Sequence, residues 1–260
     1  MPLRHDWFTV EQVDADTYAI SEYGHWEKVH AYLLLGERLA ALIDTGIGIA
    51  DMSEVVRKLT RLPVKVITTH VHWDHIGSHG RFDEIYVHEL EEDWLRCGIP
   101  GLPIEQIRHD VGRDITIPVP ADFSLDRYEP FRGKPTGLIR DGDTLDLGNR
   151  TLDFIHTPGH SPGHLCIYEE KRGYLYTADL IYRGTLYAFY PTTDPQQFVR
   201  SVEKVSRLPF IARLLPGHLE MDLDRAFLME VCDACRQLSE AGLDRHGSGV
   251  HRYGSFSIYF

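Results

Sequence analysis

The first third of the chain alternates short apolar runs with turn-forming residues, a pattern typical of β-strands. The apolar or alternating runs fall at residues 17–21, 30–35, 39–43 and 64–69. Residues 51–61 instead repeat their apolar positions with a helical period, and Pro63 stands just beyond them. The pattern therefore predicts a group of strands, then a helix, then a buried strand that leads directly into residues 70–75.

The same order of elements returns in the second half of the chain. After a strand near 84–88 and a helix over 89–96, strands are predicted at 138–140, 144–147, 151–156, 164–169, 173–178 and 211–215. A helix over 195–208 begins at Asp194-Pro195, and a final helix covers 222–241. Two similar halves of strands covered by helices indicate an α/β or α+β protein with two packed sheets and helices outside.

Regular patterning fades between residues 98 and 135, where six of the fourteen prolines occur. A long irregular segment inside a compact domain is usually functional or disordered. We expect a single domain over residues 1–260 that carries this Pro-rich insertion.

Charge and composition exclude several classes of protein. The chain has 260 residues and a formal net charge of −12, so its average surface repels nucleic acid. Four cysteines are too few for a disulfide framework, and Cys232 and Cys235 are expected to be buried apolar residues. The first seven residues contain no apolar leader, and no apolar run reaches a membrane-spanning length. We expect a cytoplasmic protein with a small-molecule substrate and neither nucleic acid nor membrane as partner.

The histidines suggest the chemistry. Among fifteen histidines, three fall in the segment His70-Val71-His72-Trp73-Asp74-His75, directly after a predicted strand. In an extended loop, His70 and His72 point the same way and can bind one ion, while Asp74 and His75 can reach a second ion. Three imidazoles and a carboxylate within six residues predict a metal site.

Later residues extend this set of metal ligands. His160, Asp179 and His218 each follow a predicted strand, in Thr157-Pro158-Gly159-His160, Tyr176-Thr177-Ala178-Asp179 and Leu215-Pro216-Gly217-His218. Ligands that follow strands lie along one rim of the sheets, where loops on a rigid scaffold usually carry function.

These motifs, together with Asp44 in Ile43-Asp44-Thr45-Gly46, resemble those of the metallo-β-lactamase superfamily over about residues 33–218. The resemblance implies a four-layer αββα sandwich. It also implies that His70, His72 and His160 bind one metal, that Asp74, His75 and His218 bind the second, that Asp179 bridges both, and that Asp44 orients the loop.

Nitrogen and carboxylate ligands without thiolate suit two divalent ions, zinc first and iron or manganese as alternatives. The resemblance then implies a binuclear hydrolase of a small ester, lactone or acyl thioester, with a metal-bridging hydroxide as nucleophile. Asp74 would carry the proton to the leaving group. Tyr182, three residues after Asp179, either supports the oxyanion, as in lactone-opening relatives, or is an aromatic residue that packs at a strand end.

Differences between this chain and some branches of the family reduce the number of branches to which it can belong. Glyoxalase II enzymes end in a helical domain, whereas only one predicted helix and a tail follow His218. A mononuclear iron persulfide dioxygenase and a β-lactamase-like amide hydrolase remain alternatives. By analogy, the insertion at 98–135 would form a lid or a substrate groove. The tail 255–260 alternates like a strand and is expected to pack on its own domain or on a second copy, as a homodimer. His25 is expected in a plain surface turn, and His164 in a structural role.

Overall fold

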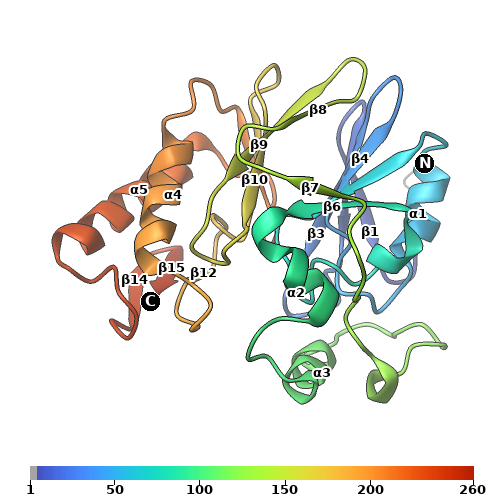
Figure 1. The fold of residues 1–260 in the computed structure, drawn as a ribbon, viewed down its shortest axis with the longest axis horizontal. Helices are drawn as coiled ribbons and strands as arrows, with labels where there is room; N and C mark the ends of the chain where they lie inside the picture. The colour runs from blue at the N-terminus through green and yellow to red at the C-terminus, as the bar shows by residue number, and fades with distance from the viewer. Residues whose placement is uncertain (1–4) are drawn as a thin grey trace. The chain divides into compact units, whose positions relative to one another are not determined.

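The computed structural model describes residues 5–260 and divides the chain into two compact units (Figure 1). The N-terminal unit comprises Met1–Leu138 and Leu147–Asn149, and the C-terminal unit comprises Ile139–Asp146 and Arg150–Phe260. The expectation about a leader segment rests in part on residues 1–4, which lie outside the described residues. Within residues 5–260, no helix is both long and apolar enough to cross a membrane.

The N-terminal unit is built on a seven-stranded sheet with the order β1-β2-β3-β4-β5-β6-β7. Its strands are β1 Thr9–Asp14, β2 Thr17–Ser21, β3 His30–Leu35, β4 Ala40–Ile43, β5 Val64–Ile67, β6 Glu84–His88 and β7 Gly137–Ile139. Strands β4, β5 and β6 run parallel, so their carboxyl ends share one edge of the sheet. This edge carries Asp44 after β4 and His70 after β5.

The helices of this unit include one that the sequence pattern did not predict. Helix α1, Met52–Leu59, begins where Asp51 accepts a hydrogen bond from the Ser53 amide, and α2 covers Glu92–Cys97. Helix α3, Ile104–Gly112, lies inside the Pro-rich segment and buries Ile107 and Val111. The expectation of an irregular segment over 98–135 was therefore wrong at α3, because two apolar side chains one turn apart give this short helix a buried face.

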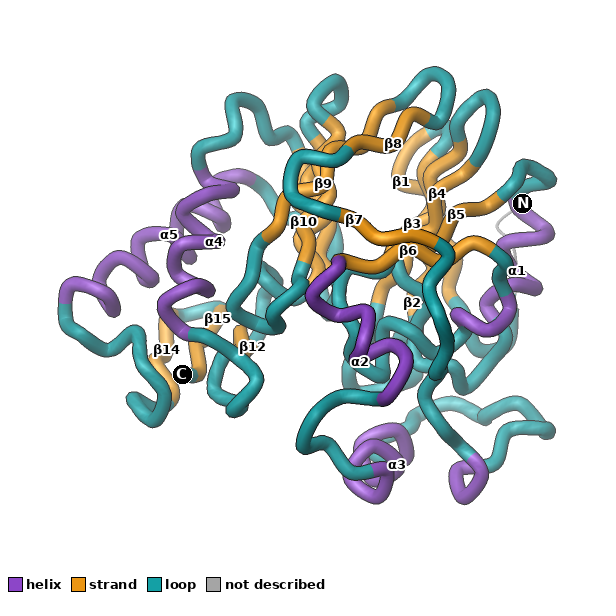
Figure 2. Tube along the Cα trace, in the orientation of Figure 1, coloured by secondary structure: helices purple, strands orange, loops and turns teal. Residues whose placement is uncertain are grey.

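The C-terminal unit holds a five-stranded sheet with the order β13-β11-β10-β9-β8, of which β8, β9 and β10 are labelled in Figure 2. Its strands are β8 Thr144–Asp146, β9 Thr151–His156, β10 Leu165–Glu169, β11 Tyr174–Ala178 and β13 Arg213–Pro216. Helices α4, Pro195–Ser206, and α5, Arg225–Glu240, begin at Asp194 and Asp224, whose side chains accept backbone amide hydrogens. Because β11 and β13 are parallel, Asp179 and His218 follow strands that end at the same edge.

A small sheet completes the C-terminal unit, with the order β12-β15-β14. Strand β12 covers Thr185–Tyr187, β14 covers Val250–Tyr253 and β15 covers Phe256–Tyr259. The strand predicted in the tail is thus confirmed, and it pairs within its own unit on both sides. Cys232 and Cys235 are buried free thiols in the apolar core, as predicted.

Candidate metal centre

Four of the predicted ligands lie in the loop that follows β5. His70, Asp74 and His75 are buried, and His72 is half-buried. The ring of His70 lies 4.6 Å from that of His72 and 4.2 Å from that of His75, measured between centroids. His70 Nε2 and His72 Nδ1 are 3.1 Å apart. The loop therefore gathers three imidazoles tightly, as binding a common set of ions requires.

Asp44 fixes the orientation of this loop. Its carboxylate accepts hydrogen bonds from the amide and hydroxyl of Thr69, at 2.8 and 2.7 Å, and from Nδ1 of His75 at 2.8 Å. With Nδ1 protonated, Nε2 of His75 keeps its lone pair for a metal ion. Asp44 itself has a φ of 59°, a left-handed conformation that Asp and Asn tolerate better than most residues.

Two buried carboxylates near this loop were not anticipated from the sequence. Glu91 accepts a 2.5 Å hydrogen bond from the amide of Val71, the residue between His70 and His72. Glu22 accepts hydrogen bonds from the Ile47 amide at 2.7 Å and from the indole of a tryptophan near the N-terminus at 2.5 Å. Burial raises the pKa of Glu22 to about 7. Neither residue belongs to a local motif, so nothing in the sequence around it indicated a role.

Close backbone contact joins the loop after β4 to the loop after β5. A Cβ atom on Gly77 would lie 2.1 Å from the carbonyl carbon of Ile47, and one on Gly48 would lie 2.8 Å from the Cα of Gly77. Only glycine allows two backbones to approach this closely. The two glycines thus hold the loop of Asp44 against the loop of His75.

The remaining predicted ligands belong to the C-terminal unit, where a single carboxylate lies between two imidazoles. His160 donates a hydrogen bond from Nδ1 to the Tyr187 carbonyl at 2.8 Å, and its Nε2 is 3.4 Å from Asp179 Oδ2. His218 Nε2 is 3.1 Å from the other oxygen, Asp179 Oδ1. Each oxygen of Asp179 therefore faces a different histidine.

His164 supports Asp179 through the backbone. Its Nδ1 is 2.9 Å from the Thr157 hydroxyl, and its Nε2 accepts a hydrogen bond from the Asp179 amide at 3.2 Å. Because His164 is fully buried and both ring nitrogens bond within the protein, the structural role predicted for it is confirmed.

Tyr182 lies next to the predicted ligand His218, but its hydroxyl already donates a hydrogen bond within the protein. The ring centroid is 5.3 Å from that of His218, and 5% of the residue is exposed. The phenol donates a hydrogen bond to the carbonyl of Thr185. Since a phenol has one proton to donate, an oxyanion could receive it only after this bond breaks.

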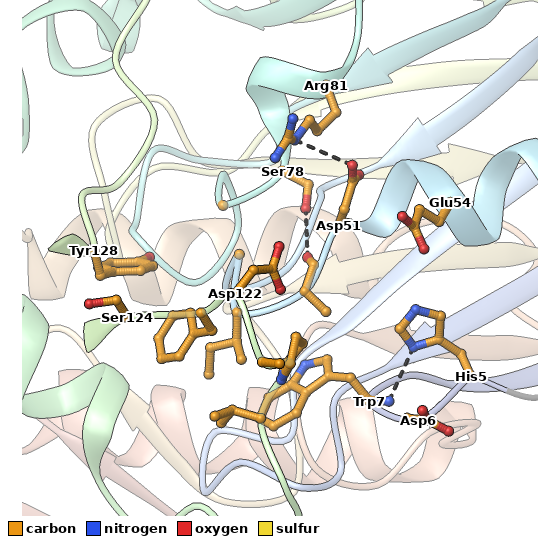
Figure 3. Close-up of a pocket in the computed structure, with 18 of the residues that line it drawn as sticks. His5, Asp6, Trp7, Asp51, Glu54, Ser78, Arg81, Asp122, Ser124 and Tyr128 are labelled. Atoms are coloured by element: carbon orange, nitrogen blue, oxygen red, sulfur yellow. Dashed lines mark hydrogen bonds and ion pairs between the residues drawn. The ribbon is translucent and has the colours of Figure 1, made fainter. Parts of the chain in front are cut away.

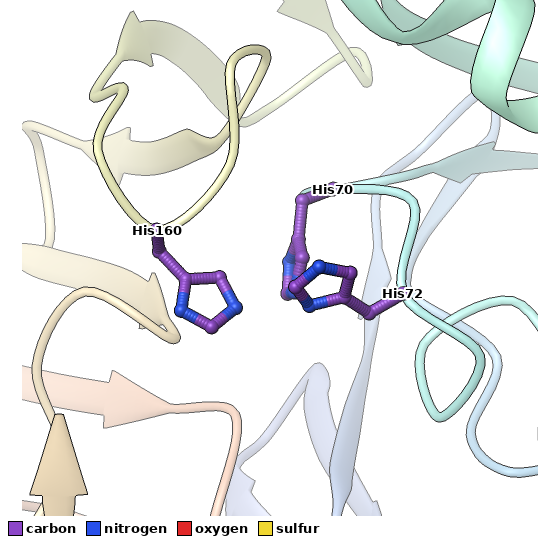
Figure 4. A group of neighbouring side chains, drawn as sticks. All are labelled: His70, His72 and His160. Carbon is purple, nitrogen blue, oxygen red and sulfur yellow. The ribbon is translucent and has the colours of Figure 1, made fainter. Parts of the chain in front are cut away.

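The seven predicted ligands fall into three groups whose nitrogen and oxygen atoms could hold a metal ion. These groups are His70, His72 and His160; His70, His75 and Asp179; and Asp74, His75 and His218. Figure 4 shows the imidazoles of the first group. Imidazole nitrogen and carboxylate oxygen without thiolate fit zinc, and also iron or manganese. The composition of the donor set therefore fits a divalent metal centre.

A loop before β3 packs on helix α3, against expectation. His25 is buried, with Nε2 3.2 Å from the Val111 carbonyl, and the Trp26 indole donates to the Asp110 carbonyl at 2.9 Å. The guanidinium carbon of Arg113 lies 3.4 Å from the centre of the Trp26 ring. The expectation of a plain surface turn at His25 was wrong, because the Pro-rich segment covers it.

The Pro-rich segment also lines a pocket of about 890 Å³ in the N-terminal unit (Figure 3). In its wall Arg81 Nε lies 3.4 Å from Asp51, and Ser78 donates a hydrogen bond to the carbonyl of Ala50. Acidic residues outnumber basic ones in the lining: Asp6, Asp51, Glu54, Asp122 and Glu129 against Lys58, Arg81 and Arg127. The pocket therefore disfavours a polyanionic ligand. Contact between this segment and a substrate stays a prediction.

Comparison with known proteins gives a consistent result. A family model described as the metallo-beta-lactamase superfamily matches residues 25–218. Acyl-coenzyme A thioesterase MBLAC2 of Homo sapiens is 26% identical, with 97% of this chain and 92% of that protein covered. A hydroxyacylglutathione hydrolase of Thermosynechococcus vestitus is 24% identical, with 74% of this chain and 63% of that protein covered.

Solved structures agree on the fold. The metallo-beta-lactamase family protein TTHA1429 from Thermus thermophilus superposes with a TM-score of 0.65 at 23% identity, covering 88% of this chain and 82% of that one. At this identity the likeness concerns the fold alone, and it confirms the predicted fold class.

Proposed function

The chain belongs to the metallo-β-lactamase superfamily and is a metal-dependent hydrolase, and we propose that it uses a binuclear centre to hydrolyse acyl thioesters. The observation that carries the proposal is the position of Asp179, with one oxygen 3.4 Å from His160 and the other 3.1 Å from His218. A carboxylate whose two oxygens face two different imidazoles is suited to bridging two ions.

The donors of both units would hold the ions as the family resemblance implies. His70, His72 and His160 would bind one ion, and Asp74, His75 and His218 the other, with Asp179 between them. Two divalent ions would lower the pKa of a shared water and polarise the oxygen of the substrate carbonyl. Asp44 and the Tyr187 carbonyl would keep His75 and His160 in the tautomers that a metal requires.

A thioester is the substrate class that the relatives favour. One relative is described as an acyl-coenzyme A thioesterase, and another hydrolyses hydroxyacylglutathione, which is itself a thioester. A thiol of pKa near 8.5 leaves readily as the thiolate, so a thioesterase needs little acid catalysis. Asp74, whose carboxylate lies 3.6 Å from His75 Nε2, would then act mainly as a ligand and only secondarily as a proton carrier.

The experiment compares the hydrolysis of several types of substrate bond by protein of defined metal content. The chain is stripped with a chelator, reloaded with zinc, manganese or iron, and assayed by thiol release from octanoyl-coenzyme A and a hydroxyacylglutathione. Proton release from a lactone, a phenyl ester and a β-lactam is measured in parallel. We expect two metal ions per chain and a kcat/KM for thioesters at least about tenfold above that for the other bonds.

Several outcomes would contradict the proposal. Faster turnover of the lactone would make the enzyme a lactonase, and faster turnover of the β-lactam an amide hydrolase. One iron per chain with oxygen uptake on a persulfide would support the mononuclear dioxygenase instead. Asp233→Asn serves as a control, because this side chain on α5 is 57% exposed and lies outside the Pro-rich segment, and it should leave metal content and activity unchanged.

A further inference from the structure

A row of aromatic side chains lies on one face of the small sheet of the C-terminal unit. β12 and β15 are paired in parallel, with Tyr187 opposite Tyr259. Because successive residues of a strand point to opposite faces, these two rings share the face opposite the buried Leu186 and Ile258. Phe189, two residues beyond Tyr187, continues the same face.

These rings pack on one another and remain accessible. Phe189 stacks on Tyr259 with centroids 4.0 Å apart and an angle of 5° between planes, and Tyr190 lies 4.0 Å from Phe189. Tyr190 is 48% exposed, and the other three residues are half-buried. We call Tyr187, Phe189, Tyr190 and Tyr259 the aromatic strip. A contiguous exposed apolar surface of this kind often marks a binding groove.

The aromatic strip begins at a residue that holds a metal ligand. The carbonyl of Tyr187 accepts the Nδ1 hydrogen of His160 at 2.8 Å. The chain also reaches β12 directly from Asp179, through the loop of residues 180–184. An apolar surface that starts at the residue bonded to His160 lies where the part of a substrate nearest to the reacting carbonyl would bind.

We infer that the aromatic strip binds the acyl chain of the thioester and thereby sets the preference for chain length. This inference rests on the proposed function. The acyl chain is bonded directly to the reacting carbon, whereas the nucleotide of a coenzyme A thioester lies at the far end of a long polar arm. The strip consists of aromatic rings without a cationic side chain, so it matches an apolar chain and offers no positive charge to a phosphate.

The test varies the acyl chain on a minimal leaving group. Acetyl, octanoyl and palmitoyl thioesters of N-acetylcysteamine, which carry no nucleotide, are assayed with the wild type, Phe189→Ala and Phe189→Leu. We expect Phe189→Ala to lower kcat/KM about tenfold for the octanoyl ester and less than about twofold for the acetyl ester, because only the longer chain loses apolar contact. Phe189→Leu keeps most of the apolar area and should retain most of the octanoyl activity.

Controls and a binding measurement distinguish a failure of the aromatic strip as acyl site from a failure of the proposed thioesterase function. Met229→Ala on α5 removes another exposed apolar side chain and should not change chain-length preference. Calorimetry with the non-hydrolysable S-octyl thioether of N-acetylcysteamine should show about tenfold weaker binding to Phe189→Ala than to the wild type. Equal losses for acetyl and octanoyl substrates, or none for octanoyl, would overturn the aromatic strip as acyl site. If the wild type hydrolyses no thioester while the thioether still depends on Phe189, the proposed function fails and the apolar site remains.

Discussion

His75 donates its Nδ1 hydrogen to the buried carboxylate of Asp44 over 2.8 Å, so Asp44 determines which nitrogen of this predicted ligand is available to a metal ion. The same carboxylate accepts the Thr69 amide one residue before His70. Asp44 therefore links the loop after β4 to both ends of the segment of residues 70–75, which carries four predicted metal ligands.

Asp44→Asn should weaken metal binding without unfolding the protein. Asn tolerates the left-handed backbone at this position, but its amide can present a hydrogen to His75 and so reverse the tautomer. We expect metal affinity to fall by about 10–100-fold, as measured by competition with a chromophoric chelator. Asp126→Asn, at an exposed turn, is the matched control. Unchanged affinity in Asp44→Asn would show that the tautomer is set by other contacts.

Asp179→Asn should affect both metal content and turnover. The amide has the size of the carboxylate but lacks its charge, and one of its two ends is a hydrogen-bond donor where an oxygen now faces an imidazole. We expect fewer than two ions per chain by elemental analysis and a kcat/KM lower by about three orders of magnitude. The exposed Asp233→Asn should behave as the wild type. Retention of two ions and near-normal turnover would contradict a bridging role.

Tyr182→Phe distinguishes the two interpretations of this side chain. Because the hydroxyl donates to the Thr185 carbonyl, its removal should cost about 1 kcal/mol of unfolding free energy and lower kcat by less than about tenfold. A hydroxyl that supports the oxyanion would instead cost about 10²–10³ in kcat. Urea unfolding and the kinetics of a thioester and a lactone, measured on both proteins, decide between them. A loss in kcat of that larger size would show that the phenol changes partner during the reaction.

His79 should make stability depend on pH. Its ring nitrogens lie 2.6 and 2.8 Å from the hydroxyls of Thr45 and Thr68, and burial, with the proximity of His75, lowers its pKa to about 3. The unfolded chain takes up a proton near pH 6.5 while the folded chain does not, so stability is complete above this pH and falls as the pH decreases. From pH 7.5 to 5.5 the loss from this residue should be about 1 kcal/mol.

The measurement compares urea unfolding of the wild type and His79→Gln at both pH values. The glutamine does not titrate, so the variant should be less stable overall but should lose about 1 kcal/mol less on acidification. The exposed His109→Gln should keep the wild-type slope. Identical slopes in all three proteins would mean that His79 takes up its proton at the same pH in the folded and the unfolded chain, and would contradict the lowered pKa.

The candidate ligands could be proposed from the sequence because each follows a strand and because His and Asp at such spacing are typical of metal sites. Strand β5 was expected over 64–69 and ends at Ile67, since the Thr69 amide bonds to Asp44 rather than to a neighbouring strand. The start of α4 was also predicted, because Asp194 caps it through a contact three residues away, whereas α5 was expected from residue 222 and begins at Arg225.

Long-range contacts explain what could not be predicted. Glu22 bonds to Ile47, 25 residues away, and His25 contacts Val111, 86 residues away. The local sequence does not identify such distant partners. A carboxylate that becomes buried, or a histidine that becomes covered, therefore cannot be distinguished from an exposed residue by the sequence around it. Helix α3 was missed for a related reason: its Ile107 and Val111 form a buried face only once the rest of the unit is present.

The strand order β12-β15-β14 has a consequence for the timing of assembly. β12 carries the carbonyl that holds His160, and its partner in the sheet is β15, which covers Phe256–Tyr259. A ribosome therefore exposes the histidine nearly a hundred residues before the strand that steadies its acceptor. Metal loading before β15 is made would meet a ring whose tautomer is not yet set, so binding of an ion at His160 would follow synthesis of β15.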